Sequence, residues 1–355
     1  MYHPARVAQW LAAGSDWEKQ KKIYPLYVEI SPSGSCNHRC SFCAVDYIGY
    51  KNVFLDKEVL KTVLADMAQQ GVKSVMFGGE GEPLLMKDLA ECICWARKSG
   101  LDIGITTNAT ALTEKFLQEA LASIMWIKAS VNAGSDTAYE KIHGARAGDF
   151  ERVMKNLARA VVVRKENGLP VTLGAQAVLI PENKDNVRDL CERAKSIGLD
   201  YVVIKPYSQH LKSTGSMQQG YDKFDYSSQA KLAEELASLN DDRFQVIFRS
   251  NTMKILEEPK RYYDKCQATP NFWAYLMANG ELYGCSAYLL DERFSYGNIS
   301  HSSFKEIWEG EKRRASAEFV RDSLQIDECR KNCRMEHVNR YLWDLTHPSE
   351  HTNFI

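Results

Sequence analysis

Short aliphatic and β-branched runs alternate with longer amphipathic stretches from Leu26 to Pro206. Runs of about four to eight such residues, followed by turn residues, are typical of strands. The pattern predicts six strands, at Leu26–Ser31, Ser74–Phe77, Leu101–Thr107, Trp126–Val131, Val171–Ile180 and Tyr201–Lys205.

The stretches between these runs have helical spacing and helix-boundary residues. Asp56 is a candidate N-cap, because its carboxylate can accept hydrogen bonds from the free N–H groups of a first turn, and Gly71 ends the same stretch. The pattern predicts helices at Lys57–Gln70, Asp88–Lys98, Thr113–Ala122, Phe150–Lys165 and Lys184–Ser196.

Strands that alternate with helices favour parallel βαβ units. Six units are fewer than the eight of a closed (β/α)8 barrel. Two α/β folds therefore remain open, a partial (β/α)6 barrel and a doubly wound sheet. In both of them, functional side chains gather beyond the carboxyl ends of the strands.

The alternation loosens after Pro206. Residues 207–226 are rich in Ser, Gly, Gln and Tyr and are predicted to form a long loop, before a helix at 228–238 and a strand at 244–249. A boundary near residue 255 gives three parts, which are an N-terminal extension (1–25), a core (26–255) and a cysteine-rich domain with a C-terminal tail (256–355). We expect the aromatic, histidine-rich tail from residue 339 to fold over the opening of the core.

The composition indicates in which compartment the chain works and which partners it does not bind. It has 45 basic and 46 acidic residues and a net charge of −1, so no long-range field favours nucleic acid or an anionic membrane. No apolar run approaches the ~20 residues of a membrane span, and residues 1–22 lack the order of a signal peptide. We therefore expect a cytoplasmic protein that binds neither nucleic acid nor membrane. Ten cysteines are many for a reducing compartment, where clustered thiols are usually metal ligands or catalytic groups.

Cys36, Cys40 and Cys43 form a CxxxCxxC loop directly after the first predicted strand. Three thiolates in one short loop suit an iron–sulfur cluster or zinc. A closed zinc site requires a fourth ligand, for which His38 is a candidate. A cubane cluster held by three cysteines instead leaves one iron without a protein ligand, and that iron is open to a small molecule.

The CxxxCxxC loop resembles the signature of the radical S-adenosylmethionine (SAM) superfamily, and the likeness extends from about residue 27 to about residue 206. The segment from Gly78 to Pro83 resembles the family's Gly-Gly-Glu-Pro turn, which holds the amino group of SAM. It aligns either on Gly79-Glu80 or, as we prefer, on Gly81-Glu82. Polar residues at later strand ends also resemble family positions. The residues that the resemblance assigns to SAM are Phe42, Gly79, Glu80, Gly81, Glu82, Asn108, Ser130, Asn132 and Gln176.

The same resemblance implies a cofactor set and a chemistry. It implies a partial (β/α)6 barrel with one [4Fe-4S] cluster on Cys36, Cys40 and Cys43. It also implies an electron donor such as flavodoxin or ferredoxin. Reductive cleavage of SAM then gives a 5′-deoxyadenosyl radical, which removes a hydrogen atom from a substrate. The cofactors supply the difficult step, and the protein supplies position and exclusion of water.

Four further cysteines, Cys266, Cys285, Cys329 and Cys333, lie in the last part of the chain, and Asn279-Gly280 predicts a hairpin turn among them. Four thiolates make a fully ligated centre, either an iron–sulfur cluster or zinc. This part resembles the twitch domain, the shorter relative of the SPASM domain, which implies one auxiliary [4Fe-4S] cluster. The remaining cysteines fall in predicted helices and are expected in the core; they are Cys92, Cys94 and Cys191.

An auxiliary cluster near a radical site can accept an electron, which favours a net oxidation. The short N-terminal extension favours a small-molecule substrate, such as a sugar or sugar-nucleotide, over a peptide. Candidates for the base of this oxidation are Lys205, Tyr207, His210 and Arg249. The alternatives are a radical epimerase, a peptide-modifying radical SAM enzyme and, outside the enzymes, a zinc-binding interaction protein.

Overall fold

A computed structural model describes residues 3–354. One ten-stranded sheet runs through it, in the order β10-β9-β8-β1-β2-β3-β4-β5-β6-β7. The strands are β1 (Tyr27–Ile30), β2 (Ser74–Phe77), β3 (Asp102–Thr107), β4 (Trp126–Ser130), β5 (Thr172–Leu179), β6 (Tyr201–Pro206), β7 (Gln245–Phe248), β8 (Trp273–Leu276), β9 (Glu281–Tyr283) and β10 (Ser295–Asn298).

The α-helices between and after these strands are α1 (Pro4–Ala13), α2 (Trp17–Gln20), α3 (Lys57–Gln69), α4 (Leu89–Lys98), α5 (Glu114–Ala120), α6 (Asp136–His143), α7 (Asp149–Glu166), α8 (Val187–Ile197), α9 (Gly215–Gln219), α10 (Ala230–Ala237), α11 (Ser250–Glu257), α12 (Thr269–Phe272), α13 (Phe304–Glu309), α14 (Glu311–Asp322) and α15 (Glu336–Thr346). Within residues 3–354, no helix combines the length and the apolar character that a membrane crossing requires.

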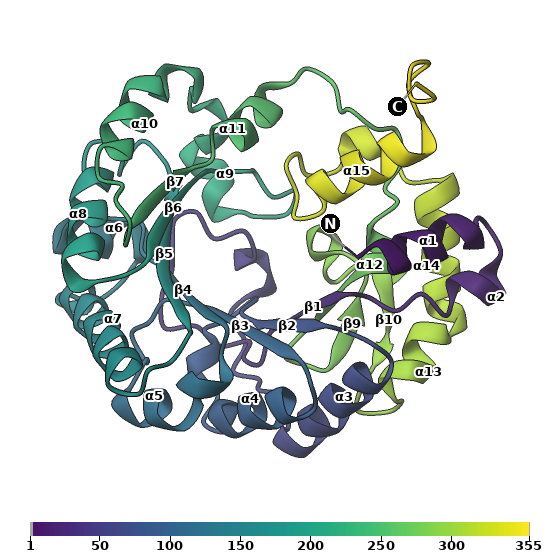
Figure 1. The fold of residues 1–355 in the computed structure, drawn as a ribbon, viewed down its shortest axis with the longest axis horizontal. Helices are drawn as coiled ribbons and strands as arrows, with labels where there is room; N and C mark the ends of the chain where they lie inside the picture. The colour runs from purple at the N-terminus through teal and green to yellow at the C-terminus, as the bar shows by residue number, and fades with distance from the viewer. Residues whose placement is uncertain (1–2, 355) are drawn as a thin grey trace.

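Strands β1 to β7 pair in parallel with their neighbours in sequence, and the sheet is curved. The long connecting helices α3, α4, α5, α7, α8 and α10 lie on the convex face, while the loop after β1 lies on the concave side (Figure 1). β7 and β10 are the two edges of the strand order, so the sheet does not close on itself. The fold is thus the partial, open barrel, and the doubly wound alternative is wrong because the connecting helices cover only one face.

Local sequence signals account for most of these elements. Each of the six predicted strands is present, with ends that differ by at most one residue, and the predicted strand at 244–249 is β7. Asp56 caps α3 as expected, since its Oδ1 accepts hydrogen bonds from the N–H groups of Glu58 (2.9 Å) and Val59 (3.0 Å). The helix α6, between β4 and α7, was not expected from the sequence pattern.

The cysteine-rich part continues the same sheet. β8 pairs in parallel with β1, which places Tyr27 opposite Trp273 and Glu29 opposite Tyr275. The predicted hairpin turn joins the antiparallel strands β8 and β9, and Gly280 in this turn has φ +85°, which favours glycine. The boundary near residue 255 falls within α11 and stays a prediction.

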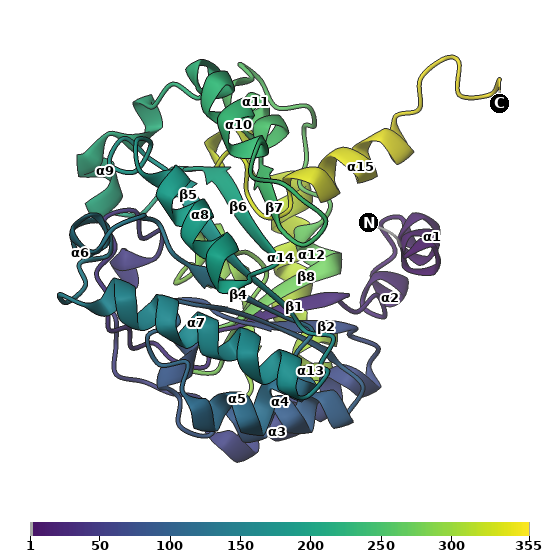
Figure 2. The ribbon, with the colours of Figure 1, turned by 60° about the vertical axis from the view of Figure 1, so that its left-hand side comes forward.

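The tail does not cover the core. Figure 2 shows the chain beyond α15 leading away from the body of the molecule, and residues 344–354 are exposed. The expectation that the tail folds over the opening is therefore wrong. The described residues 207–226 also contain the short helix α9, where a loop was predicted.

Candidate active site

The first three cysteines lie together on the loop between β1 and α3, and none of them forms a disulfide. Burial raises the pKa of the Cys40 thiol well above its usual value, and the neighbouring Cys43 and Cys36 sulfur atoms raise it further. Three adjacent thiols on one loop are the soft donors that a cubane cluster accepts. The residues of this site therefore fit a [4Fe-4S] cluster with one open iron.

Backbone contacts fix the shape of this cysteine loop. The N–H groups of Arg39 and Ser41 donate to the carbonyl oxygens of His143 (2.8 Å) and Ile142 (2.9 Å) at the end of α6. On the other side, a Cβ at Gly81 would lie 2.3 Å from the Ser33 carbonyl oxygen, so only glycine fits this approach. The turn after β2 and the end of α6 thus hold the loop from two sides.

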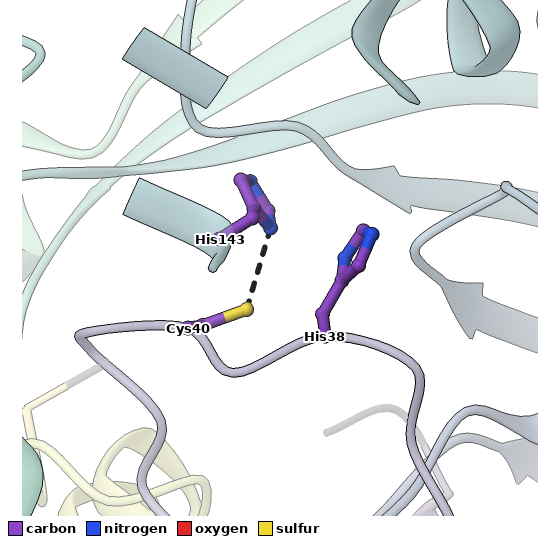
Figure 3. Close-up of side chains that lie close together, drawn as sticks. All are labelled: His38, Cys40 and His143. Atoms are coloured by element: carbon purple, nitrogen blue, oxygen red, sulfur yellow. Dashed lines mark hydrogen bonds between the residues drawn. The ribbon is translucent and has the colours of Figure 1, made fainter. Parts of the chain in front are cut away.

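His143 donates a hydrogen bond to one of the cysteines (Figure 3). Its Nε2 accepts the Asn132 backbone N–H at 3.1 Å, which places the proton of the neutral ring on Nδ1, and Nδ1 lies 3.3 Å from Cys40 Sγ. Burial, with a smaller contribution from His38, lowers the pKa of His143 well below its usual value. The ring is therefore neutral, with a fixed tautomer that directs its N–H at the sulfur.

The same region contains a second arrangement of ligand atoms. His38, Cys40 and His143 each offer one such atom, and these atoms lie within 4.8 Å of one another. Within residues 3–354 both ring nitrogens of His38 lack a hydrogen-bond partner, although Nε2 lies 3.7 Å from Asp149 Oδ2. Zinc at this triad would use Cys40, so a zinc site here and the three-cysteine cluster exclude each other.

The two acids of the glycine-rich turn differ in their surroundings. Glu82 accepts hydrogen bonds from Thr107 Oγ1 (2.5 Å) and from the Asn108 N–H (2.7 Å), and burial raises its pKa to about 6. Glu80 accepts the Ala278 N–H at 3.0 Å through Oε1, while its buried Oε2 has no partner within residues 3–354. Burial raises the pKa of Glu80 to about 7.

These contacts place the two acids on different sides of the turn. Glu82 lies close enough to raise the pKa of Cys36 and of Cys40, whereas Glu80 faces the segment after β8. The contacts of Gly79, Glu80, Gly81 and Glu82 with SAM stay predictions.

The other predicted SAM residues lie on the cysteine loop, on the strands around it or just after these strands. Asn108 donates from Nδ2 to Asn37 Oδ1 on that loop at 2.8 Å. Phe42 packs edge-on against His143, with ring centroids 5.6 Å apart. Asn132 is buried, and its Oδ1 accepts the Val178 N–H at 2.7 Å.

Ser130 and Gln176 lie beside them on neighbouring strands. Asn132 Nδ2 donates to Ser130 Oγ (3.2 Å), and Lys205 Nζ donates to Gln176 Oε1 (3.1 Å). The roles of these residues and of Phe42, Asn108 and Asn132 toward SAM stay predictions.

Two of the four candidate bases are buried, and the other two lie at the ends of strands. His210 is buried and uses both ring nitrogens, one toward the Ser286 carbonyl oxygen (3.3 Å) and one toward the Lys212 N–H (3.1 Å), and burial lowers its pKa to about 4. Tyr207 is buried as well. Lys205 and Arg249 instead lie at the ends of β6 and β7, and burial lowers the pKa of Lys205 to about 7.

The last four cysteines line one pocket, together with several apolar side chains. Tyr288 Oη lies 3.2 Å from Cys329 Sγ, and Asn339 Nδ2 donates to Cys266 Sγ at 3.4 Å. Burial and the neighbouring Cys266 thiol raise the pKa of Cys333 to about 12. Four thiols in one pocket fit a fully ligated iron–sulfur cluster.

The remaining cysteines lie away from both sets. Cys92 and Cys191 are fully buried in the core between the sheet and the helices, as expected. Cys94 differs from this expectation because it is half-buried, and it donates to the Glu119 carbonyl oxygen at 3.3 Å.

Both cysteine-bearing parts of the chain match known protein families. Residues 30–194 match the radical SAM superfamily, and residues 266–334 match SPASM, an iron-sulfur cluster-binding domain. The chain therefore belongs to the radical SAM superfamily and carries a SPASM-type domain after its core. Its cofactors are SAM, a [4Fe-4S] cluster and auxiliary iron–sulfur ligation in the second domain.

Individual relatives share only part of the chain. One is dTDP-4-amino-4,6-dideoxy-D-glucose ammonia-lyase of Streptomyces venezuelae, 30% identical over 178 residues, or 49% of this chain and 36% of the relative. Another is the S-adenosylmethionine-dependent nucleotide dehydratase of Lacinutrix mariniflava, 34% identical over 119 residues, or 32% of this chain and 25% of the relative. This chain thus spans well under two thirds of either relative.

Solved structures share the fold. The crystal structure of Streptococcus suis SuiB bound to SAM has a TM-score of 0.62 and 19% identity, and the match covers 81% of this chain and 66% of SuiB. SuiB has also been solved bound to its precursor peptide SuiA, with a TM-score of 0.63 and 19% identity over 81% of this chain and 65% of SuiB.

Replacing Cys36, Cys40 and Cys43 together by alanine should abolish reductive SAM cleavage. The anaerobically reconstituted variant should keep roughly half of the iron, because the second cysteine set holds its own cluster. The measurements are 5′-deoxyadenosine by chromatography and iron per chain. Deoxyadenosine formation in the triple variant would contradict the assignment of the first site.

Replacing His143 by Phe should make the first cluster harder to reduce. The Nδ1–H of His143 stabilises the more negative, reduced cluster, and phenylalanine keeps the ring but removes this donor. We expect about a tenfold smaller equilibrium constant for reduction, equivalent to ~59 mV for one electron. EPR-monitored redox titration measures it, with the auxiliary cluster as the internal control. An unchanged potential at full iron content would show that the hydrogen bond has no effect.

Proposed function

We propose that this enzyme oxidises a small-molecule substrate, a sugar or sugar-nucleotide, by two electrons, and that the second cysteine site accepts one of them. The observation that supports this most is the course of the segment 329–334, which carries Cys329 and Cys333. Arg330 on this segment donates to the Ser208 carbonyl oxygen (2.8 Å), and Arg334 reaches Glu29 on β1 (2.9 Å). The segment therefore spans the concave side from β6 to β1.

Side chains connect the two cysteine sites directly. Tyr47, on the loop after Cys43, stacks on His210 with ring centroids 5.1 Å apart. His210 in turn contacts the carbonyl oxygen of Ser286, the residue after Cys285. A substrate on the concave side would thus lie between the two sites, with a short protein path from one to the other.

The balance of the reaction follows from this placement. When bound, SAM would take one electron from an external donor through the first cysteine site and release methionine. The 5′-deoxyadenosyl group supplied in this way would take one hydrogen atom from the substrate and leave as 5′-deoxyadenosine. The substrate would then lose one proton to a base or to water, and a cluster held by the second cysteine set would accept the remaining electron, which would complete a two-electron oxidation. Each turnover consumes one SAM, because the hydrogen atom stays on the deoxyadenosine.

The names of the relatives support a sugar or nucleotide substrate but not an oxidation. One is named for a dTDP-amino sugar and the other for a nucleotide, and both are phosphorylated small molecules. Their names describe an ammonia-lyase and a dehydratase, so oxidation rests on the second cysteine site alone. SuiB is bound to a peptide, but its likeness to this chain concerns the fold and carries no support for a peptide substrate.

An epimerase is the second outcome to consider, since it would need a hydrogen donor on the concave side. Cys92 and Cys191 are fully buried in the core against the convex face. Cys94 on α4 contacts the end of α5, also on the convex side. Among residues 3–354, no cysteine outside the two cluster sets is therefore placed to return a hydrogen atom to substrate.

The proposal can be tested in heavy water with SAM, dithionite and a panel of nucleoside diphosphate sugars. We expect about one 5′-deoxyadenosine per product, and a product that is lighter by two hydrogen atoms and has no deuterium at the reacting carbon. Mass spectrometry makes both measurements. A product of unchanged hydrogen count that gains deuterium would replace oxidation by epimerisation, and loss of water or ammonia would replace it by elimination.

A further inference from the structure

Positive charge accumulates on the concave face without matching acids. Four cationic side chains lie near enough to Lys205 to lower its pKa, two of them also lower the pKa of Lys128, and one carboxylate, that of Glu29, lies near both lysines. The cations are Lys128 on β4, Lys205 on β6, Arg249 after β7, and Arg330 and Arg334 on the segment 329–334. This set is called the cation cluster below.

Strand alternation accounts for the direction of the strand lysines. On β4, Ile127 and Ala129 are fully buried against the helices of the convex face. Lys128 lies between them and is half-buried, so its side chain faces the opposite, concave side. Lys205 follows the same rule on β6, where the neighbouring Ile204 belongs to the core.

Little of the positive charge of the cluster is matched by negative charge. Arg334 pairs with Glu29 at 2.9 Å, and Lys205 donates to Gln176 at 3.1 Å. Within residues 3–354, Lys128 Nζ has no hydrogen-bond acceptor and lies over the Trp126 ring, 5.2 Å from its centroid. Arg330 donates only to uncharged oxygens of Ser208. One carboxylate thus faces five cations.

Burial and the excess of cations over acids lower the pKa values of both lysines. Burial, together with Arg334 and Arg249, lowers the pKa of Lys128 to about 8, and Glu29 offsets this in part. Burial and four neighbouring cations lower the pKa of Lys205 to about 7. Lys128, Lys205 and Arg330 are half-buried, whereas Arg249 and Arg334 are exposed. Unpaired charges on half-buried side chains are costly, and such an arrangement is common where a ligand of opposite charge binds.

SAM does not supply the missing negative charge. It carries one carboxylate, one ammonium and one sulfonium group, so its net charge is positive. An iron–sulfur cluster held by the four thiolates of the second cysteine set would be an anion and would offset the charge of Arg330, which lines that pocket. A monocarboxylate substrate would still leave most of the remaining cations unmatched. A phosphate or diphosphate group brings two or more negative charges and several acceptor oxygens, which suit lysine and arginine donors.

We propose that the cation cluster binds the phosphate or diphosphate group of the substrate on the concave face, between the two cysteine sites. This inference rests on the proposed function and narrows its substrate class to phosphorylated molecules, such as a nucleoside diphosphate sugar. Arg330 also lines the pocket of the second cysteine set, so the anion lies next to the auxiliary site. An anion here holds Lys205 in its ammonium form, which makes Lys205 a binding residue rather than the base.

Calorimetry with inorganic pyrophosphate on the anaerobic holoenzyme, with SAM present, tests this binding site. We expect pyrophosphate to bind, acetate to bind at least tenfold more weakly, and added salt to weaken both. Lys128→Gln should lower the affinity for pyrophosphate about tenfold, since it removes one charge-assisted contact. Lys155→Gln is the matched control, because Lys155 is exposed on α7, away from the cluster. This variant should bind pyrophosphate with the affinity of the unmodified enzyme.

The melting temperature is a second measurement, and it distinguishes a ligand-binding lysine from one that only stabilises the fold. Without a ligand, Lys128→Gln removes a source of repulsion, so we expect its Tm to rise above that of the unmodified protein. Pyrophosphate should raise the Tm of the unmodified protein more than that of the variant. A Lys128→Gln variant that melts lower and binds pyrophosphate equally well would overturn the anion site.

The two proposals fail in different ways. Deoxyadenosine formation from SAM reports on the proposed function and needs no pyrophosphate. An enzyme that cleaves SAM and oxidises a sugar but ignores pyrophosphate would refute the cation cluster as an anion site and leave the oxidation intact. An enzyme that binds pyrophosphate through Lys128 but eliminates water or ammonia from its substrate would keep the anion site and refute the oxidation.

Discussion

The parallel pairing of β8 with β1 is the constraint on which the arrangement of both sites depends. β1 lies between β2 and β8, and the register sets Glu29 beside Tyr275. The cysteine-rich part is therefore bonded to the barrel through a backbone ladder rather than through a flexible linker. Two further contacts across the same seam support this pairing, the Ala278 N–H to Glu80 and Arg334 to Glu29. Together with the Arg330–Ser208 contact, this seam fixes the relation between the two cysteine sets.

The concave face combines two kinds of destabilising group, and both are explained by ligands. Seven thiols lie in two buried or half-buried sets without disulfides, and the cation cluster lies between strands that carry one matching acid. A protein selected for stability alone would replace such groups with apolar side chains or ion pairs. Their presence on one face, while the convex face is an ordinary apolar core, indicates that this face is built around bound cofactors and substrate.

Local sequence patterns were sufficient for the barrel strands, the N-cap of α3, the hairpin turn and the two cysteine sets, because each depends on residues close together in the chain. The pairing of β8 with β1 was not predictable, since a four-residue strand carries no information about a partner far away in sequence. His143 was missed because α6 was not predicted, although Ser135 accepts from the Ala138 N–H as its N-cap. The cation cluster was missed because its members come from four separate segments, and Lys205 and Arg249 were considered only as bases.

Anomalous diffraction from anaerobically grown crystals, at the iron and zinc absorption edges, tests the central claim most directly. The account predicts two iron sites, one beside Cys36, Cys40 and Cys43 and one within the four cysteines of the second domain, both facing the concave side of the sheet. Zinc at the His38, Cys40 and His143 triad, or zinc in the second cysteine set, would contradict it.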